Sequence, residues 1–275
     1  GYGSLALAGL CGNNRVGIAG DTANAPHLRA RAKRIIFLFM AGGVSHVDSF
    51  DYKPRLTADD GRLLDFADLR SIAKTGKSPQ QRVMKPRWSF SKRGESGLWI
   101  SDLFPEMARH ADDLCVVRSM HTEGIAHGPA TLFLHTGSTT FVRPSFGSWV
   151  DYGLGSENDD LPGFVSLCPS LGNGGPRNYG SGFLPAVVQG TAIGRAGMLA
   201  KDATIRNLVS TMSRDESVRR LSLLRDLHAE QIVSKPGESE LEAVIESSEL
   251  AWRMQDSAPR VLDMRDETPE TLSLY

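Results

Sequence analysis

Four side chains with the chemistry of an acid, a base or a metal ligand follow an apolar run near the start of the chain. They are Ser45, His46, Asp48 and Asp51. The run before them, residues 35–40, contains no polar residue, which is typical of a parallel strand buried on both faces. Ligands of open α/β sheets bind beyond the carboxyl ends of such strands. The sequence therefore places these side chains where a site is expected.

His46 and Asp48 are separated by one residue and suit a single divalent metal ion. Imidazole and carboxylate ligands favour Zn, Mn or Fe, and carboxylate oxygens also bind Ca. In the alternative interpretation, Ser45 and Asp48 cap a short helix and His46 stacks on the loop. The residues alone leave both interpretations open.

A second polar group follows residues 114–118, which we predict to be a strand parallel and adjacent to 35–40. His121 lies just after this strand. His127 lies at or just before the start of a helix that Gly137 ends. Because a helix N-terminus favours anions, His127 is the first catalytic candidate, as phosphoryl acceptor, acid, base or ligand, and His121 is the second. The alternative for His127 is a helix-capping histidine.

The composition excludes several classes of function. The 275 residues carry a net charge of -1 and 40% hydrophobic residues, so we expect no nucleic-acid partner. No apolar stretch approaches the ~20 residues of a transmembrane helix, so we expect no stable membrane span. The three cysteines lie far apart, which indicates neither a zinc site nor a disulfide framework.

We interpret residues 1–32 as a signal-peptide remnant and arm, and residues 33–275 as the N-terminal part of one α/β domain. The remnant is short and apolar and precedes an A-x-A pattern at residues 23–25. We therefore expect a periplasmic or secreted protein. Further elements are expected as a helix at 145–153, a strand at 164–167, a long loop at 169–197, and a helical hairpin at 214–233 and 238–254.

Four ordered motifs resemble the bacterial DUF1501 family. They begin at Phe39 (FMAGGVSHVDSFDYKP), Pro144 (PSFGSWV), Leu161 (LPGFV) and Gly182 (GFLPAVVQGT). That family is similar to the alkaline phosphatase and sulfatase superfamily and often carries a twin-arginine export signal. The resemblance therefore implies an alkaline phosphatase-like fold, with a largely parallel sheet flanked by helices, and an exported protein.

The resemblance assigns roles to individual residues. Sulfatases present Cys-x-Pro-Ser-Arg before a short helix that ends in Thr-Gly, and here His127-Gly-Pro129 leads to Thr136-Gly137 at the same spacing. The nucleophile's position falls on His127, and Thr131 stands where the arginine would be. The superfamily's first strand ends in a metal-binding aspartate, for which His46 and Asp48 are the nearest substitutes.

Two functions follow from the resemblance. The first is a metal-dependent hydrolase of sulfate or phosphate esters, with a small-molecule or polysaccharide ester as substrate. The alternative is a non-catalytic carbohydrate- or polymer-binding relative that kept the fold. No Asp/His cluster follows Gly137, and Tyr275 falls in what looks like the opening of a further helix. We therefore expect the site and the domain to be incomplete in these residues.

Overall fold

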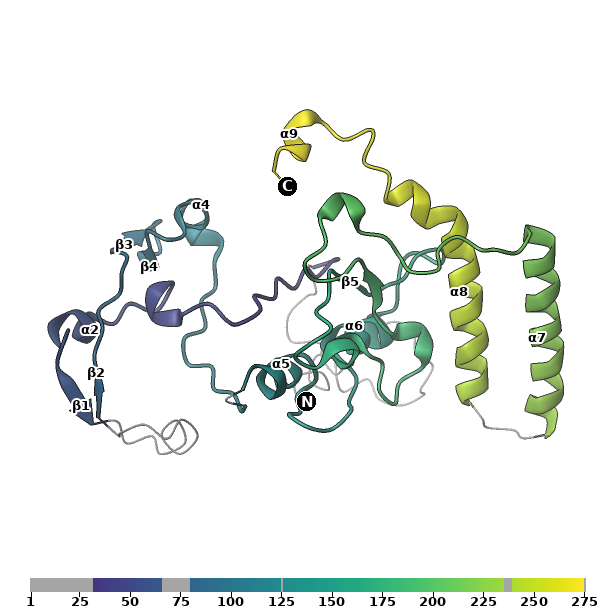
Figure 1. Cartoon of the computed structure of the whole chain (residues 1–275), viewed down its shortest axis with the longest axis horizontal. Coiled ribbons are helices and arrows are strands. Elements are labelled where there is room, and N and C mark those ends of the chain that lie inside the picture. Colours follow the sequence, from purple (N-terminus) through teal and green to yellow (C-terminus); the bar gives the residue numbers. More distant parts are fainter. Residues whose placement is uncertain (1–31, 66–79, 125, 235–238, 275) are drawn as a thin grey trace, which may run out of the picture. The chain divides into compact units, whose positions relative to one another are not determined.

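The structure is a computed structural model that describes residues 32–65, 80–124, 126–234 and 239–274. The chain divides into two compact units, one of residues 35–125 and one of residues 1–34 with 126–275 (Figure 1). The predicted signal remnant and its A-x-A pattern lie outside the described residues. Each unit is described by itself.

Two antiparallel hairpins and short helices make up the unit of residues 35–125. The hairpin strands are β1 (Leu63–Asp65) with β2 (Gln80–Arg82), and β3 (Phe90–Arg93) with β4 (Leu98–Ser101). The helical turns are η1 (His46–Asp48), α2 (Pro54–Ala58), α4 (Pro105–Ala108) and η2 (Ala111–Asp113). The sequence of residues 90–99 is typical of either a loop or a short strand pair around Gly94 and Gly97, and the structure forms the strand pair. The amphipathic pattern of residues 101–113 predicts one helix, but only α4 and η2 form there.

Aromatic side chains hold the segment after η1 against the second hairpin. The Tyr52 ring lies 5.2 Å from the ring of Phe90 and 4.6 Å from that of Trp99, between centroids. Phe50 stacks on Phe104 at 5.2 Å. The Ser101 amide donates to the Ser49 carbonyl at 2.9 Å, beside the fully buried Ile100. These rings are half-buried, and their stacking adds apolar contact beside the buried Ile100.

The two predicted central strands of this unit are not strands in the described structure. Residues 35–40 belong to none of the described strands, and their exposure runs from 38% at Phe39 to 83% at Ile36. Residues 114–118 are also irregular. An apolar run becomes a parallel strand only when neighbouring strands supply its hydrogen bonds. In each described hairpin of this unit, the two strands follow each other in sequence and pair antiparallel with one another.

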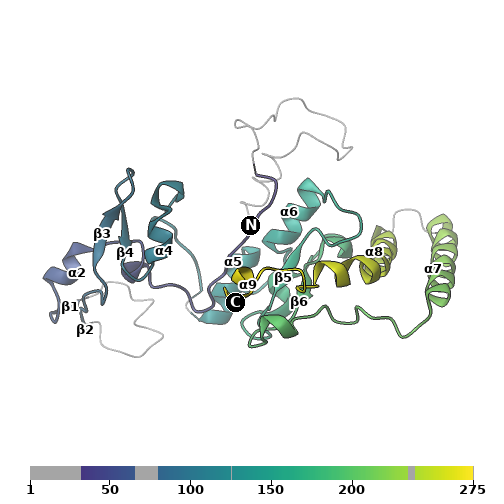
Figure 2. The same cartoon turned by 90° about the horizontal axis from the view of Figure 1, so that it is seen from above.

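The unit that contains residues 126–275 holds the long helices and a parallel strand pair. The strands are β5 (Val165–Leu167) and β6 (Thr191–Ile193), which lie side by side (Figure 2). The helices are α5 (His127–Thr136), α6 (Phe146–Leu154), α7 (Arg214–Ser234), α8 (Ser239–Val261) and α9 (Pro269–Leu272). Short turns complete it: η3 (Gly175–Tyr179), η4 (Ala186–Val188) and η5 (Ala200–Asp202). The predicted helices near 127, 145, 214 and 238 and the strand at 164–167 are confirmed.

Buried serines fasten the start of α6 to the segment after η3. The carbonyl of Gly180 accepts two hydrogen bonds, from the Ser145 amide at 2.9 Å and from the Ser148 hydroxyl at 3.1 Å. Since the Ser148 hydrogen is used there, the Ser145 hydroxyl donates to Ser148 Oγ at 2.9 Å. Ser145 and Ser148 are at most 1% exposed. We call this arrangement the serine clasp; every hydroxyl in it is satisfied, as buried polar groups require.

Glycines of two motifs lie against the ring of Phe164, which belongs to a third motif and precedes β5. A β-carbon at Gly147 would lie 2.4 Å from the Phe164 ring, and one at Gly190 would lie 2.7 Å from it. A β-carbon at Gly182 would lie 2.6 Å from the Pro144 nitrogen. The motifs beginning at Pro144, Leu161 and Gly182 therefore pack together, and their small residues make room for one another.

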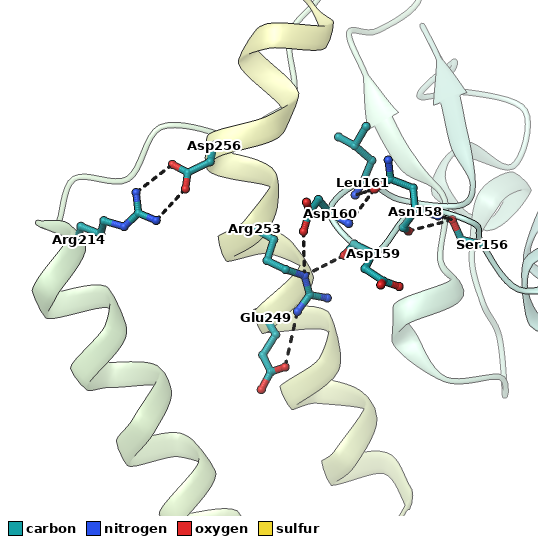
Figure 3. A network of polar contacts seen from close by, with 9 residues as sticks. All are labelled: Ser156, Asn158, Asp159, Asp160, Leu161, Arg214, Glu249, Arg253 and Asp256. Atoms are coloured by element: carbon teal, nitrogen blue, oxygen red, sulfur yellow. Dashed lines mark hydrogen bonds and ion pairs between the residues drawn. The ribbon is translucent and has the colours of Figure 1, made fainter.

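Charged side chains along α8 contact both the loop before β5 and helix α7 (Figure 3). The Arg253 guanidinium donates to the Asp159 carbonyl at 2.8 Å and pairs with Asp160 at 3.7 Å and with Glu249 at 3.8 Å. Arg214 of α7 pairs with Asp256 of α8 at 3.0 Å. The two helices run side by side in both views (Figures 1 and 2), as the predicted hairpin requires.

We predict that Gly182→Ala destabilises this unit more than Gly175→Ala does. Both glycines have positive φ, 60° and 52°, so either alanine costs about 1 kcal/mol in backbone strain. At Gly182 the new methyl also meets backbone, which adds roughly 1–3 kcal/mol, whereas nothing lies within 4 Å at Gly175. Urea unfolding followed by circular dichroism measures the difference. If the free energy of unfolding fell equally in the two variants, the close approach of Gly182 to Pro144 would be contradicted.

Candidate functional site

His46 and Asp48 occupy the three-residue turn η1 (His46–Asp48). A 3₁₀ turn has three residues per turn, so positions i and i+2 project about 120° apart around its axis. The Asp48 carboxylate accepts a hydrogen bond from the Ser45 hydroxyl at 2.7 Å, and His46 is exposed. The alternative interpretation has Ser45 and Asp48 cap a short helix. Ser45 is the N-cap residue of η1 but makes no side-chain capping hydrogen bond, and its hydroxyl binds the Asp48 carboxylate instead. In this conformation the two side chains do not converge on one ion.

Asp51, the last member of the first polar group, has a structural partner. Its carboxylate is 12% exposed and pairs with the Lys53 ammonium at 2.9 Å. The Asp51 amide donates to the His46 carbonyl at 2.9 Å. Throughout the described ranges, no group of three or more His, Cys, Asp or Glu residues could hold a metal ion.

The two histidines predicted to be catalytic fall in different units. His121 is exposed in an irregular segment of the unit of residues 35–125. His127 is the first residue of α5, after Ala126 at the N-cap, and is also exposed. The prediction that His127 opens a helix which ends at Gly137 is therefore confirmed. The Gly137 φ of 71° is the left-handed conformation that glycine supplies at a helix end.

The start of α5 lies against the loop that leaves β5. A β-carbon at Gly128 would be 3.9 Å from the Asn173 Cα, so the two segments pass close to each other. Asn173 has a φ of 50°, and its carbonyl accepts a hydrogen bond from the Asn178 amide at 2.9 Å. His127 thus stands beside a loop at the carboxyl end of a parallel strand, which is where α/β proteins bind ligands.

A cavity that we did not foresee lies at the same end of the parallel pair. It measures about 380 Å³ and is lined by residues 170–172 after β5 and residues 195–198 after β6. The prediction of one long loop at 169–197 is wrong, because η3, η4 and β6 lie within these residues. β6 begins at Thr191, the last residue of the motif that begins at Gly182, so that motif is the nearest sequence feature to the second wall of the cavity.

Burial shifts the pKa values of two side chains of this unit. The pKa of Asp151 on α6 is raised because the carboxylate is partly buried, and no hydrogen bond or ion pair of this carboxylate is present in the described part of the chain. A β-carbon at Gly163 would meet its Oδ1, so the carboxylate packs directly on the Gly163 backbone. The pKa of His135 on α5 is lowered by burial, which favours the neutral imidazole.

The model of a family of proteins of unknown function, DUF1501, matches residues 32–275. The chain belongs to the DUF1501 family. No curated protein and no solved structure matches it. The match confirms the family resemblance that the four motifs indicated. Among the described helices of this DUF1501 protein, none is both long and apolar enough to cross a membrane.

We predict that Asp151→Asn stabilises the DUF1501 chain at pH 7. Because the folded-state pKa of Asp151 is raised above 3.8, the protonated acid is favoured in the fold, and that contribution is lost as pH rises through the folded pKa. The neutral asparagine removes the charge that burial disfavours. Thermal unfolding at several pH values should show a higher midpoint for the variant than for the wild type at pH 7, and this difference should vanish below pH 3.8.

Asp202→Asn is the matched control, because Asp202 is exposed on η5 and the same charge is removed. It should leave the midpoint of thermal unfolding nearly unchanged. A loss of stability in Asp151→Asn at pH 7 would show that the carboxylate is stabilised by a partner, against the burial argument.

Proposed function

We propose that this protein acts on sulfate or phosphate esters, as an exported hydrolase related to the alkaline phosphatase and sulfatase superfamily. One observation carries the proposal: His127 opens α5 beside the loop that leaves the carboxyl end of β5. A helix N-terminus presents unsatisfied N–H groups and a positive dipole end, which favour an oxyanion. An exposed histidine at that position has access to the oxygen of a bound ester.

In the proposed reaction, the ester's sulfate or phosphate group lies at the N-terminus of α5. The Gly128 amide is available to it, whereas Pro129 has no N–H to offer. Water attacks the sulfur or phosphorus atom, and the bond from that atom to the alcohol oxygen breaks. Protonated His127 donates its proton to the leaving alcohol oxygen, while the attacking water releases a proton to solvent. The substrate class is a small-molecule or polysaccharide ester, in keeping with the family resemblance.

We assign no step to a metal ion. His46 and Asp48 project about 120° apart in η1, and Asp48 is engaged by Ser45, so the pair does not fit a shared ion as it stands. A divalent metal (Zn, Mn, Fe or Ca) remains an expectation of the superfamily relation. An alkaline phosphatase-like, largely parallel sheet is likewise proposed; the parallel pairing of β5 with β6 supports it. Export to the periplasm or cell surface rests on the family resemblance.

A second function is favoured by the residues at the sulfatase-like motif. His127 and Thr131 stand where a sulfatase carries its nucleophile and its arginine. A relative that kept the fold and lost this chemistry would bind a carbohydrate or another polymer without cleaving it. The two functions differ in turnover, which an assay measures directly.

We predict that His127→Ala lowers hydrolysis of aryl sulfates or aryl phosphates by about 100-fold or more, the usual contribution of a general acid or base. His110→Ala is the control, since the His110 side chain is 71% exposed and lies in the unit of residues 35–125. The full chain is assayed after incubation with Zn, Mn, Fe or Ca. Equal turnover in both variants would contradict the role of His127. Saturable binding of the esters by the wild type without turnover would favour the binding function.

A further inference from the structure

The cavity beyond β5 and β6 has the position and size of a ligand site. β5 ends at Leu167 and β6 at Ile193, and the cavity is lined by the loops that leave these two ends. Ligands of α/β proteins bind beyond the carboxyl ends of neighbouring parallel strands. The volume of about 380 Å³ falls within the roughly 300–1,000 Å³ of small-molecule sites.

Main-chain hydrogen bonds fix the two walls of the cavity relative to each other. The Cys168 amide donates to the Ile193 carbonyl at 2.8 Å, and the Ala196 amide donates to the Pro169 carbonyl at 3.0 Å. Cys168 has a φ of 44°, a conformation that non-glycine residues adopt only when their surroundings hold them there. The two walls are therefore held together through the main chain, and the cavity between them is open to solvent, because six of its seven lining residues are exposed.

The lining residues offer hydrogen-bond donors and one positive charge. The Arg195 guanidinium has no ion pair or hydrogen bond with any described residue, and no acidic residue is among those lining the cavity. Ser170 Oγ accepts a hydrogen bond from the Gly172 amide at 3.1 Å, which leaves the hydroxyl hydrogen available to a ligand. Leu171 and Met198 add apolar surface.

We propose that this cavity binds a small organic oxyanion, with Arg195 as the residue that recognises the charged group. A planar guanidinium matches the paired oxygens of a carboxylate, a sulfate ester or a phosphate ester. Leu171 and Met198 contact the apolar part of the ligand. The site goes beyond the proposed ester hydrolysis and does not depend on His127.

The test measures binding of three anions of similar shape to the full chain, by calorimetry and by amide NMR. Benzoate, phenyl sulfate and phenyl phosphate distinguish the three oxyanions, and benzyl alcohol is the neutral probe. Arg195→Gln removes the charge. Gly172→Leu fills the cavity, because a β-carbon there would meet only Ser170 Oγ at 3.7 Å. Arg206→Gln is the matched control, since Arg206 is exposed and does not line the cavity.

We expect at least one anion to bind more tightly than benzyl alcohol. Arg195→Gln should weaken that binding about tenfold or more, as loss of a charged hydrogen bond does. Gly172→Leu should also weaken it, and Arg206→Gln should not. Three results would overturn the proposal: no binding of any of the three anions, unchanged affinity in Arg195→Gln, or an equal loss in Arg206→Gln. Circular dichroism of each variant shows whether a loss reflects unfolding.

Discussion

The serine clasp is the interaction on which the rest of the unit of residues 126–275 depends. Two hydrogen bonds converge on the Gly180 carbonyl, from Ser145 and from Ser148, and both donors are buried. If this buried carbonyl lost both donors, no hydrogen bond would compensate for its desolvation, and the fold would be less stable. The clasp therefore fixes the point at which the chain turns from η3 towards η4 and β6.

Close packing around Phe164 connects the serine clasp to the strand pair of β5 and β6. Phe164, the residue before β5, lies against Gly147 of α6 and Gly190 before β6. The Thr191 amide donates to the Phe164 carbonyl at 2.9 Å, which sets the parallel register of β5 and β6. Because the cavity opens where these strands end, the register of β5 and β6 decides which residues of the two loops meet at it.

The motifs of this DUF1501 protein thus divide into two kinds. Those that begin at Pro144, Leu161 and Gly182 supply glycines and serines whose small size and buried hydroxyls permit close packing. The first motif carries titratable side chains, yet Asp51 pairs with Lys53 and Asp48 is engaged by Ser45. His127 and Arg195, on which the proposed chemistry rests, lie outside these motifs. A motif rich in polar residues is therefore not by itself evidence of a site.

The sequence alone determined the helices of residues 126–275, because Ser145 at an N-cap, Gly137 at a helix end and the apolar periodicity of α8 are local signals. The four motifs also indicated the DUF1501 family, to which the chain belongs. Tertiary structure alone decided whether an apolar run becomes a strand: residues 165–167 have a neighbour in β6, whereas residues 35–40 belong to no described sheet. It also decided which loops meet at the cavity, since residues 170–172 and 195–198 are brought together by a strand pairing that no local pattern encodes.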